Sequence, residues 1–274
     1  NRLISLGFNM TAVGKHPWGT STSLAMFDGC LLEIMGIYDD TLIDEVPAGD
    51  FHFGRHIFEH LQVREGVALS ALHSSDSAKD AATAQDARFT VAGHLEFGRD
   101  VTLPDGSADR TRTTLALLPD PDFPRLSFFL CQQHRPELIY VAQWLEHPNT
   151  VNGINGVTIL AKAAHHEPLK EKLTGIYGNA SPLNGGFFVQ TANGRFSVQT
   201  LDAIQAEFGE LPADIADGDT PSIVAMDLVY QNAKTFEAWI KNSSLRIRKT
   251  ASGCYATRPE DTANVILRFG HGVA

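Results

Sequence analysis

The hydrophobic pattern between residues 20 and 37 predicts two strands joined by a tight turn. Apolar residues dominate the ranges 21–27 and 30–37, and the Asp28-Gly29 pair between them is a strong two-residue hairpin signal. Glu33 stands in the middle of the second strand, where successive side chains point to opposite faces. Both faces are expected to be buried, and a buried carboxylate needs a cation, a metal or several hydrogen-bond donors. Glu33 is therefore the sharpest chemical signal in the chain.

The rest of the chain repeats one order of predicted elements. Strand-like runs begin near Val67, Val157 and Ile223, and each is followed by a run with helical spacing and then by three more strand-like runs. The residues before Val67 fit the same order without its opening strand. Four units of one kind indicate an internally repeated α+β fold.

Within the first unit, the spacing predicts the end of a helix at residues 1–6, a strand at 8–13 and a helix over 53–61. A boundary between two pairs of units is expected near residues 149–156. It divides the chain into residues 1–150, which hold the candidate site, and residues 151–274.

Composition narrows the class of partner. The 274 residues carry a formal net charge of -10 with no basic cluster, which argues against a nucleic-acid surface. No apolar run approaches the roughly 20 residues of a membrane span. The three cysteines (Cys30, Cys131 and Cys254) are scattered and odd in number, as expected for free thiols in a reducing cytoplasm. A small molecule is therefore the expected partner, with no nucleic acid and no membrane.

Four segments resemble the glyoxalase-like branch of the vicinal oxygen chelate superfamily. They are GKHPWGT (14–20), FDGCLLEIMGI (27–37), FFLCQQHRPE (128–137) and HPNTVNGINGV (147–157). The resemblance covers the whole chain and is strongest over residues 1–157, although Thr22 stands where Asn is expected and Thr150-Val151 replace Gly-Ala. It implies βαβββ modules, four in this chain with the first lacking its opening strand, that form two curved, cup-like mixed sheets. It also implies a divalent metal that chelates vicinal oxygens of a small substrate.

The resemblance further implies the roles of individual residues. Glu33 lies on the fourth strand of the first module, where a carboxylate ligand is expected. His134 ends the corresponding strand of the second module and is expected to point into the cup. These two residues would hold Fe, Mn, Ni or Zn and act in catalysis, with another ligand from a strand preceding Asn1. The residues expected to contact the substrate are His16, Trp18, Thr20, Gln132, Gln133, Glu137, His147 and Asn149.

The second pair of modules departs from this pattern. Gln199 and Ile266 stand at the corresponding strand positions and supply no charge. Residues 151–274 are therefore expected to form a degenerate pair, kept for architecture or to cover the first pair.

Two functions remain open at the level of sequence. The first is a metal-dependent enzyme of the lyase, isomerase or dioxygenase type that acts on a small oxygenated substrate. The second is a non-catalytic small-molecule binding protein on the same scaffold, in which Glu33 pairs with an arginine. For Trp18 a place in the core is favoured over a substrate contact. Paired cups often dimerise, so a homodimer is one expected assembly.

Overall fold

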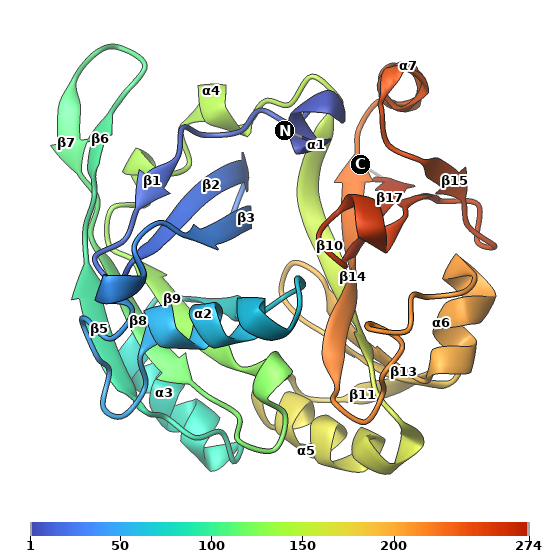
Figure 1. The fold of residues 1–274 in the computed structure, drawn as a ribbon, viewed down its shortest axis with the longest axis horizontal. Coiled ribbons are helices and arrows are strands. Elements are labelled where there is room, and N and C mark those ends of the chain that lie inside the picture. Colours follow the sequence, from blue (N-terminus) through green and yellow to red (C-terminus); the bar gives the residue numbers. More distant parts are fainter. Residues whose placement is uncertain (1, 273–274) are drawn as a thin grey trace. The chain divides into compact units, whose positions relative to one another are not determined.

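The computed structural model describes residues 2–272, and the chain divides into two compact units (Figure 1). The N-terminal unit comprises Thr11–Val63 and Ala68–Leu145. The C-terminal unit comprises Asn1–Met10, Arg64–Val67 and Glu146–Ala274. Asn1, where the first predicted helix would start, lies outside the described residues.

The N-terminal unit begins with a three-stranded antiparallel sheet. Its strands are β1 (Gly14–Lys15), β2 (Thr20–Phe27) and β3 (Cys30–Ile37). The predicted hairpin is confirmed, with Phe27 opposite Cys30. Gly29 adopts a φ of 73°, which glycine reaches without steric cost. Two short helices follow, η1 (Asp40–Leu42) and α2 (Phe53–Val63), the second as predicted.

The strand predicted at residues 8–13 is wrong. This segment is irregular, and regular pairing with β2 begins only at β1. The cause lies at Thr11, whose hydroxyl oxygen accepts a hydrogen bond from the Leu24 amide at 2.9 Å. A side chain thereby replaces the backbone carbonyl that a regular ladder would use.

A four-stranded mixed sheet completes the N-terminal unit. Its strands are β4 (Ser70–Ser74), β5 (Gly93–Phe97), β8 (Thr113–Leu118) and β9 (Phe128–Gln133), in the order β4-β9-β8-β5. The first strand, β4, runs parallel to the last, β9, and the other pairs are antiparallel. A ribbon of β6 (Asp100–Thr102) and β7 (Ala108–Arg110) extends between β5 and β8. The remaining helices are α3 (Ser77–Asp86), η2 (Pro124–Leu126), η3 (Pro136–Leu138) and α4 (Ala142–Leu145).

The two faces of this four-stranded sheet have different neighbours. Leu95, Leu115 and Phe129 share one face by register, and they pack in one cluster with Trp18 and Phe53. The opposite face is covered by α3. The face with Leu115 is called the core face below, and the other the α3 face.

The C-terminal unit is built on one eight-stranded sheet. Its strands are β10 (Val151–Leu160), β11 (Ala180–Leu183), β12 (Gly186–Gln190), β13 (Arg195–Gln199), β14 (Ser222–Tyr230), β15 (Ile247–Lys249), β16 (Tyr255–Thr257) and β17 (Ile266–His271). The order is β11-β12-β13-β10-β14-β17-β16-β15. In each half of the sheet, β10–β13 and β14–β17, the first strand runs parallel to the last. Strands β10 and β14 join the two halves as an antiparallel pair. The helices are α1 (Arg2–Ser5), η4 (Ala163–His165), α5 (His166–Tyr177), α6 (Leu201–Phe208), α7 (Ala233–Asn242) and η5 (Pro259–Asp261).

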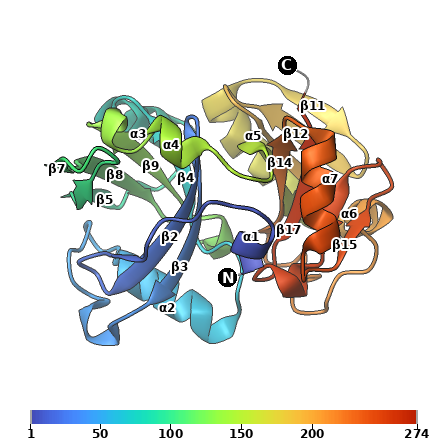
Figure 2. The same cartoon turned by 90° about the horizontal axis from the view of Figure 1, so that it is seen from above.

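Helices cover both faces of β14–β17. Ile204 and Phe208 of α6 pack with Val224 and Ile266 on one face. Phe236 of α7 stacks on Tyr230 on the other face, and Figure 2 shows α7 alongside β17. Helix α6 therefore covers the face of β14 and β17 that carries Ile266.

The α+β class with several open mixed sheets is confirmed, but the module count is not. The part of the chain that the structure describes holds three complete βαβββ modules, beginning at β4, β10 and β14. The β1–β3 sheet contains no parallel pair and forms a sheet of its own. Four sheets, not two, are therefore present among residues 2–272.

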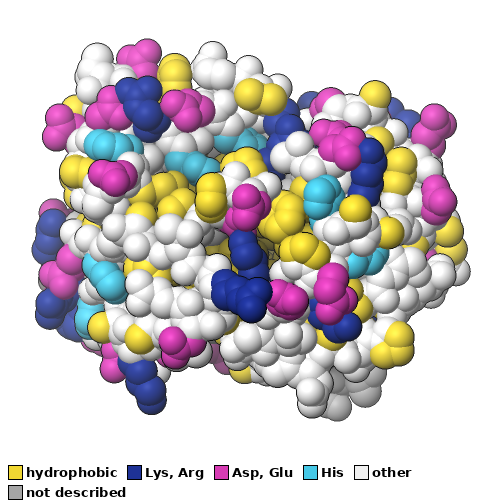
Figure 3. Space-filling view, turned by 90° about the horizontal axis from the view of Figure 1, so that it is seen from below, with side chains coloured by type: hydrophobic (Ala, Val, Ile, Leu, Met, Phe, Trp, Pro, Cys, Tyr) yellow, Lys and Arg dark blue, Asp and Glu magenta, His cyan; other side chains and the backbone are white. Residues whose placement is uncertain are grey.

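Within residues 2–272, no helix is both long and apolar enough to cross a bilayer. On the face shown in Figure 3, acidic and basic side chains are interspersed. The three cysteines are free thiols, as expected.

Candidate functional site

Glu33 lies on the face of the β2–β3 hairpin that carries Thr22, Leu24 and Met35. In the register, Leu24 is opposite Glu33 and Thr22 is opposite Met35. Thr22 is buried, and its hydroxyl donates a hydrogen bond to Glu33 Oε1. Met35 packs against the cluster around Trp18, so this face of the hairpin is turned toward the core face of the four-stranded sheet. Thr22, the position that departs from the family pattern, therefore orients the carboxylate.

Surrounding protein perturbs the Glu33 carboxyl group. Desolvation raises the pKa of Glu33 above its usual value, and the hydrogen bond from Thr22 and the charge of Arg99 counteract this only in part. The residue nevertheless remains exposed, and Ile34 beside it is 47% exposed. The expectation that both faces of β3 are buried is thus wrong. Protein atoms therefore crowd the carboxyl group, while the residue as a whole remains in contact with water.

Arg99 is a functional candidate that the sequence did not reveal. It follows β5, and a Cβ atom at Gly14 would lie 2.9 Å from its Nη1 atom. Its positive charge acts on both Glu33 and His16. Burial lowers the pKa of Arg99, and Glu33 opposes that change. No motif surrounds Arg99 in the sequence, and only the packing of β5 beside β1 brings it here.

His16, Trp18 and Thr20 form a buried wall. His16 Nδ1 lies 2.9 Å from the Thr20 hydroxyl oxygen, and its ring stacks on Trp18 with centroids 4.8 Å apart. Burial, aided by the charge of Arg99, lowers the pKa of His16 to about 3. The imidazole is therefore neutral at ordinary pH and already engaged by Thr20. Trp18 lies in the core, as favoured from the sequence.

The two faces of β9 separate the residues that were expected to act together. Gln133 is opposite Thr113 and Cys131 is opposite Leu115, which places both on the core face. Gln132 and His134 alternate with them and belong to the α3 face. Gln132 Oε1 accepts hydrogen bonds from the amide and the hydroxyl of Ser77 at the start of α3, both at 3.0 Å.

The expectation that His134 points into the cup with Glu33 is therefore wrong in its geometry. His134 Nε2 lies 2.7 Å from the Thr114 hydroxyl oxygen, and its ring acts electrostatically on Glu96. Glu96 pairs with Arg112 at 2.8 Å. Glu137 belongs to another exposed ion pair, with Arg135 at 2.5 Å. These residues form exposed polar clusters apart from Glu33.

Cys131 and Gln133 are the β9 side chains that share the core face. Burial raises the pKa of the Cys131 thiol to about 11, and the negative charge of Glu33 contributes in the same direction. The thiol is therefore protonated at neutral pH and is a poor nucleophile and metal ligand. Gln133 accepts from the Thr113 hydroxyl at 2.7 Å and donates to Cys131 Sγ at 3.2 Å.

His147 and Asn149, expected to contact substrate, belong to the C-terminal unit and anchor its N-terminal segment. His147 Nδ1 accepts from the Asn9 amide at 2.9 Å. Asn149 is fully buried; its Nδ2 donates to the Leu6 carbonyl at 2.8 Å, and its Oδ1 accepts from the Val151 amide at 3.0 Å. The structure thus engages their polar atoms with backbone rather than presenting them to a ligand.

Replacing Asn149 by alanine should lower the free energy of unfolding of the C-terminal unit by about 2 kcal/mol, because a buried carbonyl and a buried amide lose their partner. Urea unfolding of the full chain measures this loss. Asn152→Ala, an exposed position in the same segment, serves as control and should change stability by less than about 0.5 kcal/mol. Unchanged stability of Asn149→Ala together with lost ligand binding would instead support a substrate contact.

The described residues around Glu33 do not fit a divalent metal by themselves. Among residues 2–272, no group of three His, Cys, Asp or Glu side chains is arranged to hold a metal ion. On the core face, the neighbours of Glu33 are the protonated thiol of Cys131 and the cationic Arg99. The positive charge of Arg99 disfavours a dication nearby. A metal would need donors beyond these residues.

Comparison with known proteins gives a family match and a shared fold. The family model described as a glyoxalase-like domain matches residues 1–175. No curated protein sequence matches the chain. A hypothetical protein from Staphylococcus aureus superposes with a TM-score of 0.65 at 11% identity, covering 97% of this chain and 91% of that chain. A mutant of 4-hydroxymandelate synthase from Streptomyces coelicolor gives a TM-score of 0.55 at 12% identity, with 97% and 86% covered. At such identities, structural likeness shows the fold alone.

Proposed function

The chain belongs to the glyoxalase-like domain family, and on this basis we propose that it binds a small oxygenated molecule beside Glu33 and moves a proton at it, as a lyase or isomerase does. The observation that carries the proposal is the Glu33 carboxyl group, which has a raised pKa although the residue is exposed. A general acid or base works best when its pKa lies near the working pH, and desolvation shifts a carboxyl group in that direction.

The neighbours of Glu33 suit this role. Thr22 donates to Oε1 and fixes the orientation of the carboxylate, while Oε2 has no hydrogen-bond donor among the described residues. Oε2 is thus the atom that would accept or return the proton. Arg99 supplies a positive charge that favours an oxyanion developing on the bound molecule. Desolvation of the site strengthens both effects.

A divalent metal, expected from the resemblance, depends on donors that the described residues lack. In each complete module the first strand runs parallel to the last, yet β3 is an edge strand among residues 2–272. A strand hydrogen-bonded along β3 would complete the first module and could bring a ligand to Glu33. Such a metal would supply Lewis acidity. The dioxygenase activity considered from the sequence rests on it.

A non-catalytic binding protein is the second candidate, and Arg99 is the observation that favours it. A cation beside Glu33 would hold the carboxylate ionised and paired without any chemistry. Phe97, which is half-buried against Trp18 with ring centroids 5.1 Å apart, would then offer an aromatic surface to an apolar ligand.

Glu33→Gln distinguishes the two candidates and should abolish proton transfer. We expect the full-length protein to exchange the α-proton of a small α-hydroxy ketone such as hydroxyacetone for deuterium in D₂O. The rate should rise as the pH passes upward through the raised pKa of Glu33, because only the carboxylate accepts a proton. Glu33→Gln should lower the rate at least about 100-fold, the usual contribution of a general base. Proton NMR follows the exchange.

Glu137→Gln is the matched control, since Glu137 is an exposed glutamate of the same unit paired with Arg135. It should leave the exchange rate unchanged. Binding of the ketone without exchange would replace the catalytic proposal by the binding one. The metal content of the native protein and of both variants should be measured by elemental analysis. Stoichiometric metal that is lost in Glu33→Gln alone would show that further ligands complete a metal site at Glu33.

A further inference from the structure

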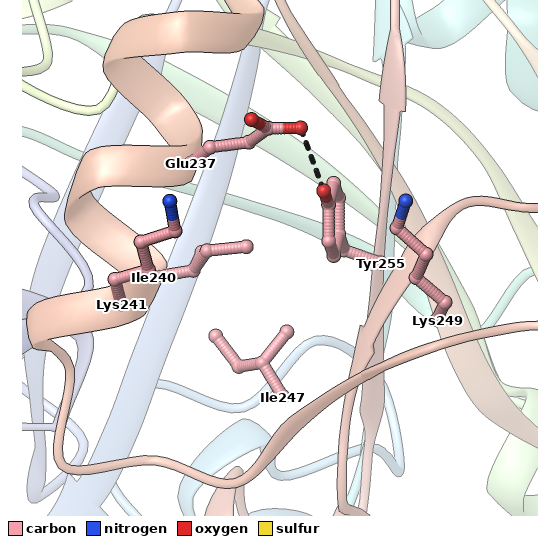
Figure 4. Close-up of a pocket in the computed structure, with 6 residues that line it drawn as sticks. All are labelled: Glu237, Ile240, Lys241, Ile247, Lys249 and Tyr255. Carbon is pink, nitrogen blue, oxygen red and sulfur yellow. Dashed lines mark hydrogen bonds between the residues drawn. The ribbon is translucent and has the colours of Figure 1, made fainter.

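A recess lies in the C-terminal unit, between α7 and the β15–β16 hairpin. It encloses about 320 Å³ and is lined by Glu237, Ile240, Lys241, Ile247, Lys249 and Tyr255. Figure 4 shows the two lysine side chains on opposite sides of this recess, with the two isoleucines between them. None of these residues belongs to the Glu33 site.

A hydrogen bond sets the charge state on one side of the recess. The Tyr255 hydroxyl donates to Glu237 Oε1 at 2.7 Å. This bond, together with desolvation, raises the pKa of Tyr255 to about 12, so the phenol keeps its proton. Glu237 therefore contributes one negative charge, and Tyr255 contributes a neutral aromatic face.

The two lysines carry more positive charge than the single carboxylate of Glu237 can neutralise. Among residues 2–272, no carboxylate lies within 4.0 Å of the ammonium group of Lys241 or Lys249. Lys249 Nζ instead lies 5.4 Å from the centroid of the Tyr255 ring. Two cations and one carboxylate leave a single net positive charge at the recess.

We propose that this recess binds a small monocarboxylate with an apolar body. The ammonium group of either Lys241 or Lys249 would hold the carboxylate, since charge-assisted hydrogen bonds are the strong ones. Ile240, Ile247 and the Tyr255 ring would contact the apolar part. The carboxylate of Glu237 repels a dianion such as phosphate more than a monoanion. The volume lies at the small end of ligand pockets, which span about 300–1,000 Å³.

Benzoate is the probe, titrated into the full-length protein by isothermal calorimetry and saturation-transfer NMR. We expect a Kd near about 1 mM and about tenfold weaker binding to the double variant Lys241→Met/Lys249→Met. Benzyl alcohol, which has the same ring without a charge, should bind no better to the native protein than to the double variant. Lys234→Met removes an exposed lysine of α7 that does not line the recess, and it should bind benzoate normally.

Glu237→Gln provides a readout that a merely structural role would not give. Glutamine keeps an acceptor for the Tyr255 hydroxyl and removes the repelling charge, so benzoate should bind more tightly, by about threefold. Equal affinity of benzoate for the native protein and the double variant would overturn the proposal. Tighter binding of inorganic phosphate than of benzoate would also overturn it, because that outcome identifies a general anion site without use of the apolar walls.

Discussion

Replacing Arg268 by methionine should lower the free energy of unfolding of the C-terminal unit by about 3–5 kcal/mol. Arg268 Nε donates to Asp227 Oδ1 at 2.6 Å and Nη2 donates to Oδ2 at 2.5 Å. The two side chains are only 18% and 11% exposed. Removing the guanidinium leaves the Asp227 carboxylate with little water and no partner cation of that geometry, and this uncompensated charge dominates the cost.

The double variant Asp227→Asn/Arg268→Met should recover part of the loss, because the isolated charge is gone. Hydrogen exchange of β14 and β17 amides in increasing urea measures the effect within this unit. Arg246→Met is the matched control: Arg246 also forms a bidentate pair, with Asp261, but is 56% exposed, so its loss should be within about 1 kcal/mol. Equal losses for Arg268→Met and Arg246→Met would show that burial does not govern the Asp227–Arg268 pair.

This ion pair has no counterpart among the sequence predictions for the C-terminal unit. Those predictions rest on Gln199 and Ile266, and neither is charged. Arg268 stands two residues beyond Ile266, on the same face of the sheet. It lies opposite Asp227, and Glu207 of α6 is 3.8 Å from its guanidinium. Alternation within one strand does not reveal which face a helix will cover, and α6 covers the face that carries Ile266.

Short stretches of sequence predicted the helices and strands well. They did not predict which face of a sheet a side chain occupies or which distant residues lie beside it. The Asp28-Gly29 turn depends on a few adjacent residues, and it is present in the structure. The face that His134 occupies depends on where α3 docks, and the bonds of Gln132 to Ser77 show this only in the folded chain. Arg99 acts on Glu33 from the segment between β5 and β6, and no sequence signal marks it. The homodimer, the cytoplasmic location and the metal remain predictions.

Replacing Trp18 by alanine should lower the free energy of unfolding of the N-terminal unit by about 3–5 kcal/mol, the cost of deleting a large aromatic side chain from a core. Trp18 is 1% exposed, and its ring lies 5.1 Å from those of both Phe53 and Phe97. His16 stacks on its other side and would lose that contact. The cavity would open beside the wall that carries His16 and Thr20, so the hairpin bearing Glu33 should loosen as well.

Trp18→Phe should cost much less than Trp18→Ala, and the difference tests the assignment to the core. Within residues 2–272, the buried Trp18 Nε1 atom has no hydrogen-bond acceptor, so phenylalanine keeps the apolar contacts while removing an unsatisfied donor. Hydrogen exchange of β2 and β9 amides measures both losses, and deuterium exchange into hydroxyacetone reports the Glu33 site in the same proteins. We expect Trp18→Phe to keep that activity. A stable Trp18→Phe protein that no longer binds the ketone would move Trp18 from the core to the substrate wall, because only a ligand contact would distinguish the indole from a ring that packs almost as well.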